Sequence, residues 1–269
     1  MNAPANNLAG DRARIEDALL AAGEVLTRHA RGDIDYEVKP GHGPVTAADH
    51  EVDALLRKRL PRGDDGWLSE ETPDDQQRLG KRRVWIVDPL DGTRSFVAKR
   101  PEYSVSIGLL VDGQPALGGV HNPATGVTVL GGKDLGLSVK GQPSLRFGAD
   151  AGGNQAVASV LRVLGSRSEI KGGEFAKWQD DPAVLVLPIS SIAYKLALVA
   201  VGAADATWTM WPKHEWDVAA GAALLLAAGG SYCLPRGLAP AWNQRRPRYG
   251  GFIAAGPDRG DEVRTQLGL

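Results

Sequence analysis

The segment from Asp88 to Thr93 reads Asp-Pro-Leu-Asp-Gly-Thr and combines two carboxylates with a glycine and a hydroxyl group. Carboxylate oxygens are the ligands that Mg²⁺ prefers, and glycine lets the backbone approach a ligand closely. The preceding residues 84–87 form a short apolar run that predicts a buried strand, from which we expect the chain to depart at Pro89. The sequence therefore predicts an oxygen-rich metal site at the end of a strand.

Two other interpretations of this segment are open. A pair of aspartates after a strand can serve only to form a turn. The segment is also similar to the strand end Asp-x-Asp-Gly-Thr of haloacid-dehalogenase phosphatases, in which the first aspartate is a nucleophile. Here, however, Asp88 and Asp91 are separated by one residue more, and the segment lies well inside the chain.

Three further segments carry acidic side chains, and each has a simple structural explanation when taken alone. Thr46 and Asp49 are spaced like a capping box before a helix. Glu70 and its neighbours could form a solvated acidic loop. Asp217 could stabilise the positive end of a helix dipole. These explanations account for each residue separately but not for the whole set.

Residues 44–49, 69–72, 88–93 and 216–221 together resemble the motifs of the inositol monophosphatase superfamily, in the order of that family. The resemblance implies Mg²⁺-dependent, Li⁺-sensitive hydrolysis of a phosphate monoester, with two or three Mg²⁺ ions per active site. It implies that Glu70, Asp88 and the carbonyl of Leu90 hold the first ion. It implies that Asp88, Asp91 and Asp217 hold the second, while Glu70 also faces a third, weaker one. Four clustered carboxylates would repel one another without such cations.

The same resemblance implies the roles of the remaining site residues. Thr93, paired with Asp49, would orient and deprotonate the attacking water, and Glu70 would be the third catalytic residue. The substrate phosphate would rest on the backbone N–H groups of Gly92 and Thr93, and a water near Asp217 would protonate the leaving group. The substrate-binding residues implied in this way are Gly92, Thr93, Ser191, Lys195 and Asp217.

Residues 165–168, 190–195 and 212–217 look more like the bacterial 3'(2'),5'-bisphosphate nucleotidase branch than like the animal inositol phosphatases. This favours hydrolysis of 3'-phosphoadenosine 5'-phosphate to AMP. Lys195 lies in an otherwise apolar stretch, so it either covers apolar surface with its stem or meets a second substrate phosphate. Glu169 departs from that branch, which usually has histidine there, and inositol 1-phosphate or a sugar bisphosphate therefore stays an alternative substrate.

The composition excludes several classes of protein. Lys and Arg number 31 against 32 Asp and Glu, a net charge of −1, so we expect no nucleic-acid partner. The single cysteine, Cys233, cannot form an intramolecular disulfide, and the N-terminus lacks the pattern of a secretory signal, which together predict a cytoplasmic protein. No apolar stretch is long enough to cross a membrane, so we expect no membrane partner. The expected partner is a small phosphate ester, and we allow for a homodimer. A regulatory binding protein that uses the basic residues 245–248 is the alternative of another class.

The pattern of apolar residues predicts the elements that must position these side chains. Helices are expected at about 11–30, 47–60, 191–202 and 216–228, a strand at 183–187, a loop at 31–44, and an antiparallel meander from residue 103 onward. The resemblance implies a layered α/β/α/β/α sandwich. We expect residues 1–145 to form an antiparallel N-terminal half with most metal ligands, and residues 146–269 a C-terminal α/β half with Asp217. The Gly-rich stretch 141–154 marks the boundary.

Overall fold

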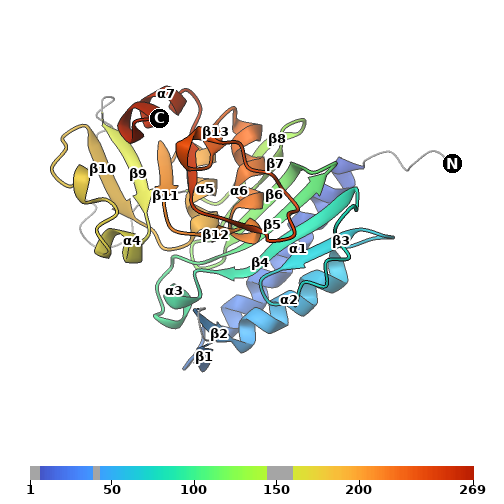
Figure 1. The fold of residues 1–269 in the computed structure, drawn as a ribbon. Helices are drawn as coiled ribbons and strands as arrows, with labels where there is room; N and C mark the ends of the chain where they lie inside the picture. The colour runs from blue at the N-terminus through green and yellow to red at the C-terminus, as the bar shows by residue number, and fades with distance from the viewer. Residues whose placement is uncertain (1–6, 39–42, 144–159) are drawn as a thin grey trace.

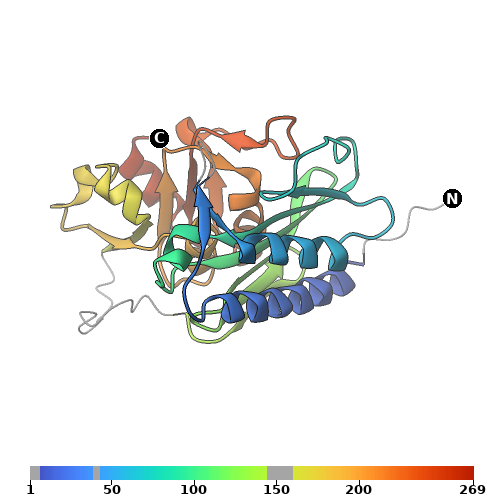
Figure 2. The same cartoon turned by 90° about the horizontal axis from the view of Figure 1, so that it is seen from below.

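Five layers of alternating helices and sheets make up the computed structural model, which describes residues 7–38, 43–143 and 160–269 (Figures 1 and 2). Helices α1 (Leu8–His29) and α2 (Ala47–Arg59) cover one face of a six-stranded sheet. Helices α5 (Ile192–Ala200) and α6 (Glu215–Ala228) lie between this sheet and a five-stranded one. Helix α7 (Gly260–Leu267) packs on the outer face of the second sheet. The predicted layered α/β/α/β/α fold is confirmed.

The six-stranded sheet contains the antiparallel meander predicted from residue 103 onward, extended at one edge by two earlier strands. Its strands, in spatial order, are β3 (Gly66–Ser69), β4 (Arg83–Asp91), β5 (Ser104–Val111), β6 (Gln114–Asn122), β7 (Val127–Gly132) and β8 (Gly136–Lys140). Only β3 runs parallel to its neighbour, β4. Asp112 and Gly113 join β5 to β6 with φ angles of 51° and 72°, the left-handed pair that a type I′ hairpin requires. Gly118 of β6 lies so close to α6 that a Cβ would come within 2.1 Å of the Ala220 carbonyl oxygen.

The prediction that the chain leaves the sheet at Pro89 is wrong, because β4 continues to Asp91. Asp88 pairs with Ser106 and Asp91 pairs with Ser104, and the register shifts between the two pairs. Proline has no backbone N–H to give to the ladder, so the sheet accommodates it in an irregularity instead of ending there. Asp88 and Asp91 therefore flank a bulge within one strand.

The sequence predicts a loop over residues 31–44, but part of this stretch forms a strand. Strand β1 (Tyr36–Val38) pairs antiparallel with β2 (Pro44–Thr46), and residues 39–42 between them lie outside the described residues. β2 leads directly into α2, so this hairpin places the start of that helix.

The second sheet carries four strands that the sequence did not predict, beside one that it did. In spatial order the strands are β10 (Val184–Pro188), β9 (Leu161–Gly165), β11 (Ala206–Thr209), β15 (Phe252–Ala255) and β13 (Ser231–Cys233), of which β10 is the predicted one. The shorter elements are α3 (Thr93–Val97), α4 (Arg167–Lys171), η1 (Ala176–Trp178), η2 (Pro235–Gly237), β12 (Lys213–His214) and β14 (Arg248–Tyr249).

One hydrophobic core joins the two predicted halves. Helices α5 and α6 from the C-terminal half pack against strands of the six-stranded sheet from the N-terminal half. α6 is apolar on all sides because it is buried between two sheets. The proposed boundary at 141–154 falls mainly on residues outside the described ranges, so the division at residue 145 stays a prediction. None of the helices in the described ranges combines the length and hydropathy that crossing a bilayer requires.

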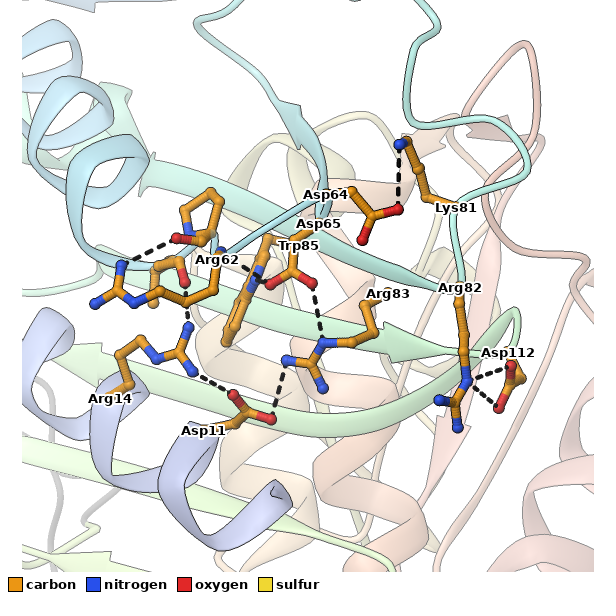
Figure 3. Close-up of polar contacts among 12 residues, drawn as sticks. Asp11, Arg14, Arg62, Asp64, Asp65, Lys81, Arg82, Arg83, Trp85 and Asp112 are labelled. Atoms are coloured by element: carbon orange, nitrogen blue, oxygen red, sulfur yellow. Dashed lines mark hydrogen bonds and ion pairs between the residues drawn. The ribbon is translucent and has the colours of Figure 1, made fainter. Parts of the chain in front are cut away.

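A polar network fixes the start of β4, at the end opposite Asp88 and Asp91 (Figure 3). Arg83 donates hydrogen bonds to Asp11 of α1 and to Asp65, each at 3.0 Å. Trp85 donates from Nε1 to the other oxygen of Asp65, at 2.8 Å. The network ties α1 and the turn before β3 to β4.

Candidate active site

A cavity of about 850 Å³ opens between the two halves of the chain and contains most of the predicted site residues. The N-terminal half contributes the end of β4, the start of α3 and the loop after β3. The C-terminal half contributes the start of α4, one side of α5 and the approach to α6. The residues of the cavity wall that could bind a ligand or support those that do are Glu70, Asp91, Gly92, Thr93, Arg167, Glu169, Lys195, Trp211, Lys213 and Asp217.

Asp91 is held by the first turn of α5. Its Oδ2 atom accepts hydrogen bonds from the Ser191 hydroxyl and from the Ala193 N–H, both at 2.6 Å. Ser191 is also the N-cap of α5, where its oxygen accepts from the N–H of Tyr194 at 3.0 Å. Ser191 therefore supports Asp91 directly, and its predicted contact with substrate stays a prediction.

Asp88 and Gly92 have backbone reasons for their positions. The Asp88 side chain is buried, and its Oδ1 accepts from the N–H of Leu90 at 3.0 Å across the bulge. Gly92 has a φ of +93°, and a Cβ there would lie 2.7 Å from the carbonyl oxygen of Glu102. Position 92 therefore requires glycine, whichever ligand the site takes.

The Asp49 side chain makes the contacts of a helix cap and also faces Thr93, its predicted catalytic partner. Its Oδ2 accepts from the Thr46 N–H at 2.8 Å and from the Thr46 hydroxyl at 2.7 Å, which forms the capping box of α2. Its Oδ1 faces Thr93, whose hydroxyl lies 3.3 Å away and also donates to the Leu90 carbonyl at 2.9 Å. The structure thus brings Asp49 and Thr93 together and leaves their catalytic role as a proposal.

Glu70 and Asp217 reach the site from opposite halves of the chain. Glu70 follows β3, whereas Asp217 is in the first turn of α6 and accepts from the N–H of His214 at 2.6 Å. Burial, and then the charge of Asp217, raise the pKa of Glu70 to about 8. Burial, and then the charge of Asp91, raise the pKa of Asp217 to about 7. The two carboxylates therefore share one electrostatic environment.

The donor set fits a hard divalent cation. Burial, followed by Glu70 and Asp91, raises the pKa of Asp88 as well, so several carboxylates here disfavour one another's charge. A bound cation would remove that penalty, and all the available donors are oxygens, as Mg²⁺ requires. Within the described residues, no three His, Cys, Asp or Glu side chains already form a group that could hold a metal ion. The side chains and the carbonyl that would hold it are those of Glu70, Asp88, Leu90, Asp91 and Asp217.

Glu169 is a central residue of the cavity wall that the sequence analysis treated only as a departure from a motif. It accepts from the Thr209 hydroxyl at 2.7 Å, from Lys213 Nζ at 3.1 Å and from Lys195 Nζ at 3.5 Å. Burial alone would raise the pKa of Glu169, but the charges of Lys195 and Lys213 hold it at about 2. A lone lysine in an apolar helix was the one sequence signal for this cluster, since a buried cation needs an anionic partner.

Two other residues of the cavity wall were assigned no role from the sequence, although Arg167 lies in the segment 165–168 that resembles the nucleotidase branch. Arg167 forms a forked ion pair with the buried Glu102, with Nε 3.0 Å from Oε2 and Nη2 2.5 Å from Oε1. Trp211 packs on Gly172, where a Cβ would come within 2.9 Å of the indole, and still leaves 44% of its surface exposed. Its backbone N–H donates to Thr209 at 3.1 Å, so the Glu169 cluster fixes this part of the wall.

A model of the inositol monophosphatase family matches residues 11–264 of the chain. The 3'-phosphoadenosine 5'-phosphate phosphatase of Mycobacterium leprae is 33% identical over 253 residues, which cover 92% of this chain and 90% of that protein. The fructose-1,6-bisphosphatase/inositol-1-monophosphatase of Thermotoga maritima is 30% identical over 217 residues, or 79% of this chain and 80% of that one. The crystal structure of CysQ from Bacteroides thetaiotaomicron, a bacterial member of the same family, matches with a TM-score of 0.76 at 26% identity, covering 92% of this chain and 97% of that one.

Proposed function

Because the chain belongs to the inositol monophosphatase family and is a phosphatase, we propose that it hydrolyses the 3'-phosphate of 3'-phosphoadenosine 5'-phosphate, giving AMP and phosphate. The family is metal-dependent, and we propose that the metal is Mg²⁺, with two or three ions per site. The nucleotide assignment is supported by the Mycobacterium leprae relative, which is named for 3'-phosphoadenosine 5'-phosphate. We further propose a cytoplasmic protein that acts on a small phosphate ester and not on nucleic acid, and allow for a homodimer.

The observation that carries the nucleotide proposal is Trp211. This half-exposed indole lies in the wall of the same cavity as the carboxylates. An aromatic face of this kind suits a planar nucleobase, because every base offers a π-face for stacking, at about 1–3 kcal/mol per base. An inositol or sugar ring offers no such face. Lys213, at 16% exposure, supplies a cation in the same wall for a second phosphate.

The chain's own residues have distinct tasks in this proposal. Thr93 and Asp49 hold the attacking water, since the hydroxyl and the carboxylate already face each other at 3.3 Å. The backbone around Gly92 receives the reacting phosphate, and a water near Asp217 gives the leaving oxygen its proton. When bound, Mg²⁺ neutralises the carboxylates and lowers the pKa of the water that reacts.

A phosphate-release assay tests the proposal on 3'-phosphoadenosine 5'-phosphate, inositol 1-phosphate and fructose 1,6-bisphosphate, each with Mg²⁺ and with excess chelator. We expect the highest kcat/KM on the nucleotide and no release in chelator. Trp211→Ala should lower kcat/KM for the nucleotide by about tenfold and leave inositol 1-phosphate nearly unchanged. Met210→Ala is the matched control, since Met210 is equally exposed at 42% beside the cavity wall.

The alternative substrates keep specific support. The Thermotoga maritima relative is named for both fructose 1,6-bisphosphate and inositol 1-phosphate, so a preference for either of them in the assay would replace the nucleotide assignment. A regulatory binding protein is the alternative of another class. In the basic segment that would serve it, Arg245 donates a hydrogen bond to Gln76 at 3.2 Å. Release of phosphate from none of the three substrates would favour that reading.

A further inference from the structure

Arg78 lies on the segment between β3 and β4 that also carries Glu70, and its side chain is fully excluded from solvent. Its guanidinium donates to both oxygens of Asp74, at 3.1 and 2.7 Å, which closes this segment on itself. The same group donates to the Asn243 side-chain oxygen at 2.5 Å and to the Gln244 carbonyl at 2.8 Å. Asn243 returns a hydrogen bond from Nδ2 to the Arg78 carbonyl at 3.1 Å.

Asn243 and Gln244 are bound in turn to the first residue of α6. Their backbone N–H groups donate to the two oxygens of the Glu215 carboxylate, at 2.8 and 2.9 Å. Glu215 is fully buried, and its own N–H donates to the Pro247 carbonyl at 2.9 Å. Asp217 follows in the same turn of the helix. A continuous chain of partly buried hydrogen bonds therefore runs from the Glu70 segment to the Asp217 helix turn.

We propose that Arg78 is a positioning residue for the metal-binding carboxylates, acting through residues 243–244 and Glu215 to hold Glu70 at a fixed place relative to Asp217. The inference rests on the proposed metal-binding role of Glu70 and Asp217. These two carboxylates come from different halves of the chain, and their charges repel. A connection that resists their separation is needed to keep both within one site.

The other side of the Glu70 segment is anchored separately. Asp53 of α2 accepts from the Ser69 hydroxyl at 2.5 Å and from the Thr72 hydroxyl at 2.7 Å. Those bonds attach the segment to its own half of the chain only. Arg78 connects this segment to the residues that bind α6, and Arg245 adds one exposed contact between the same parts of the chain, from its Nη1 to Gln76 at 3.2 Å.

The geometry requires arginine in particular. Three guanidinium nitrogens are used at once, toward a carboxylate, an amide oxygen and a backbone carbonyl. A lysine has one nitrogen and cannot reproduce this planar fork. Arg78→Lys should therefore resemble Arg78→Met in its effect on the metal site instead of restoring the native behaviour.

Calorimetric titration of Mg²⁺ into the 269-residue protein, together with thermal unfolding in chelator, tests the role. Arg78→Met should weaken Mg²⁺ binding roughly 10- to 100-fold, as loss of outer partners of metal ligands does. The matched control is Arg83→Met, because Arg83 likewise donates to carboxylates, those of Asp11 and Asp65, but at the far end of β4 (Figure 3). It should lower the unfolding temperature and keep Mg²⁺ affinity within about twofold.

The outcomes separate the possible failures. Unchanged Mg²⁺ affinity in Arg78→Met, with wild-type protein that binds Mg²⁺, overturns the positioning role. An equal loss in Arg83→Met also overturns it, because the effect is then general destabilisation. Wild-type protein that binds no Mg²⁺ contradicts the proposed metal site itself. If Arg78→Met does not fold, Asn243→Ala removes one link and leaves the Glu215 backbone bonds, and native Mg²⁺ affinity in that variant overturns the proposal.

Discussion

Lys195 and Glu169 form a buried ion pair, with Nζ 3.5 Å from Oε2 and neither side chain more than 1% exposed. Lys213 contacts the other oxygen of the same carboxylate at 3.1 Å. The lysine that the sequence suggested as a ligand for a second phosphate therefore already has an anionic partner within the protein. The charge of Lys195 stabilises the cavity wall. Measurements of stability and of turnover distinguish this structural role from a contact with substrate.

Lys195→Met should destabilise the protein by about 3–5 kcal/mol, because it leaves a buried carboxylate with only one of its two cations. The free energy of unfolding from denaturant titration measures this. Adding Glu169→Gln removes the buried carboxylate but leaves Lys213 without its partner at 3.1 Å, so the double variant should recover only part of the lost stability. A single variant as stable as the wild type would mean that the pair does not contribute to folding.

The same Lys195→Met protein, assayed where it is fully folded, tests substrate contact. If Lys195 also meets a second phosphate, kcat/KM for 3'-phosphoadenosine 5'-phosphate should fall about ten- to a hundredfold, as loss of a charge-assisted bond of roughly 1.5–3 kcal/mol predicts. Inositol 1-phosphate should then be hydrolysed almost as before. Equal losses on both substrates would assign Lys195 a structural role only.

Asp91→Asn keeps the shape of the side chain but removes one charge from the proposed metal site. We expect kcat to fall by about two to three orders of magnitude, in the range seen when a key electrostatic group is lost. An asparagine oxygen can still accept from Ser191 and Ala193, so thermal unfolding should change little. Steady-state phosphate release near the wild-type rate would show that Asp91 is only a bulge residue.

Thr93→Ala and Thr93→Ser separate the hydroxyl from the rest of the side chain. The alanine variant loses the group that faces Asp49 and the Leu90 carbonyl, so kcat should fall about a hundredfold or more while Mg²⁺ affinity stays near native. The serine variant keeps the hydroxyl and should retain most activity. A parallel loss of Mg²⁺ affinity and turnover in Thr93→Ala would contradict the proposed role in holding water.

Much of the fold could be predicted because its strongest signals are local. The helices near Asp49 and Asp217 and the antiparallel meander follow from apolar spacing and from turns such as Asp112-Gly113. The strand through Pro89 could not be predicted locally, because only the neighbouring strand β5 shows that the ladder resumes at Asp91. Residues 206–209 also gave no clear pattern, since their pairing with 252–255 is a long-range contact.

The candidate site likewise combines residues that could be predicted from the sequence with residues that could not. Its carboxylates could be identified because they lie in short motifs with recognisable spacing. Glu169 and Arg78 could not, because their partners are far away in the sequence: Lys195 lies 26 residues from Glu169, and Asn243 lies 165 residues from Arg78. No periodicity links such pairs, and tertiary packing alone makes them neighbours.

The metal-free protein should lose stability as the pH rises from about 6.5 to 8.5. Glu70 and Asp217 have pKa values of about 8 and about 7 in the folded protein, against ordinary values of 4.5 and 3.8. A carboxyl group with a raised pKa holds its proton more tightly in the folded state. Its contribution to stability is therefore lost as the pH rises through that pKa. Burial lowers the pKa of His121 below 6.5, so this histidine is mainly neutral throughout the range and does not reverse the trend.

Thermal unfolding in excess chelator at several pH values measures this loss, and Glu70→Gln combined with Asp217→Asn should flatten it. Mg²⁺ binds the deprotonated carboxylates, so the increase in unfolding temperature that it causes should be larger at about pH 8.5 than at about pH 6.5. Titrations near neutral pH should also release protons when Mg²⁺ binds. Stability that rises with pH in chelator, or an Mg²⁺ effect that does not depend on pH, would mean that these two carboxylates do not share the metal site.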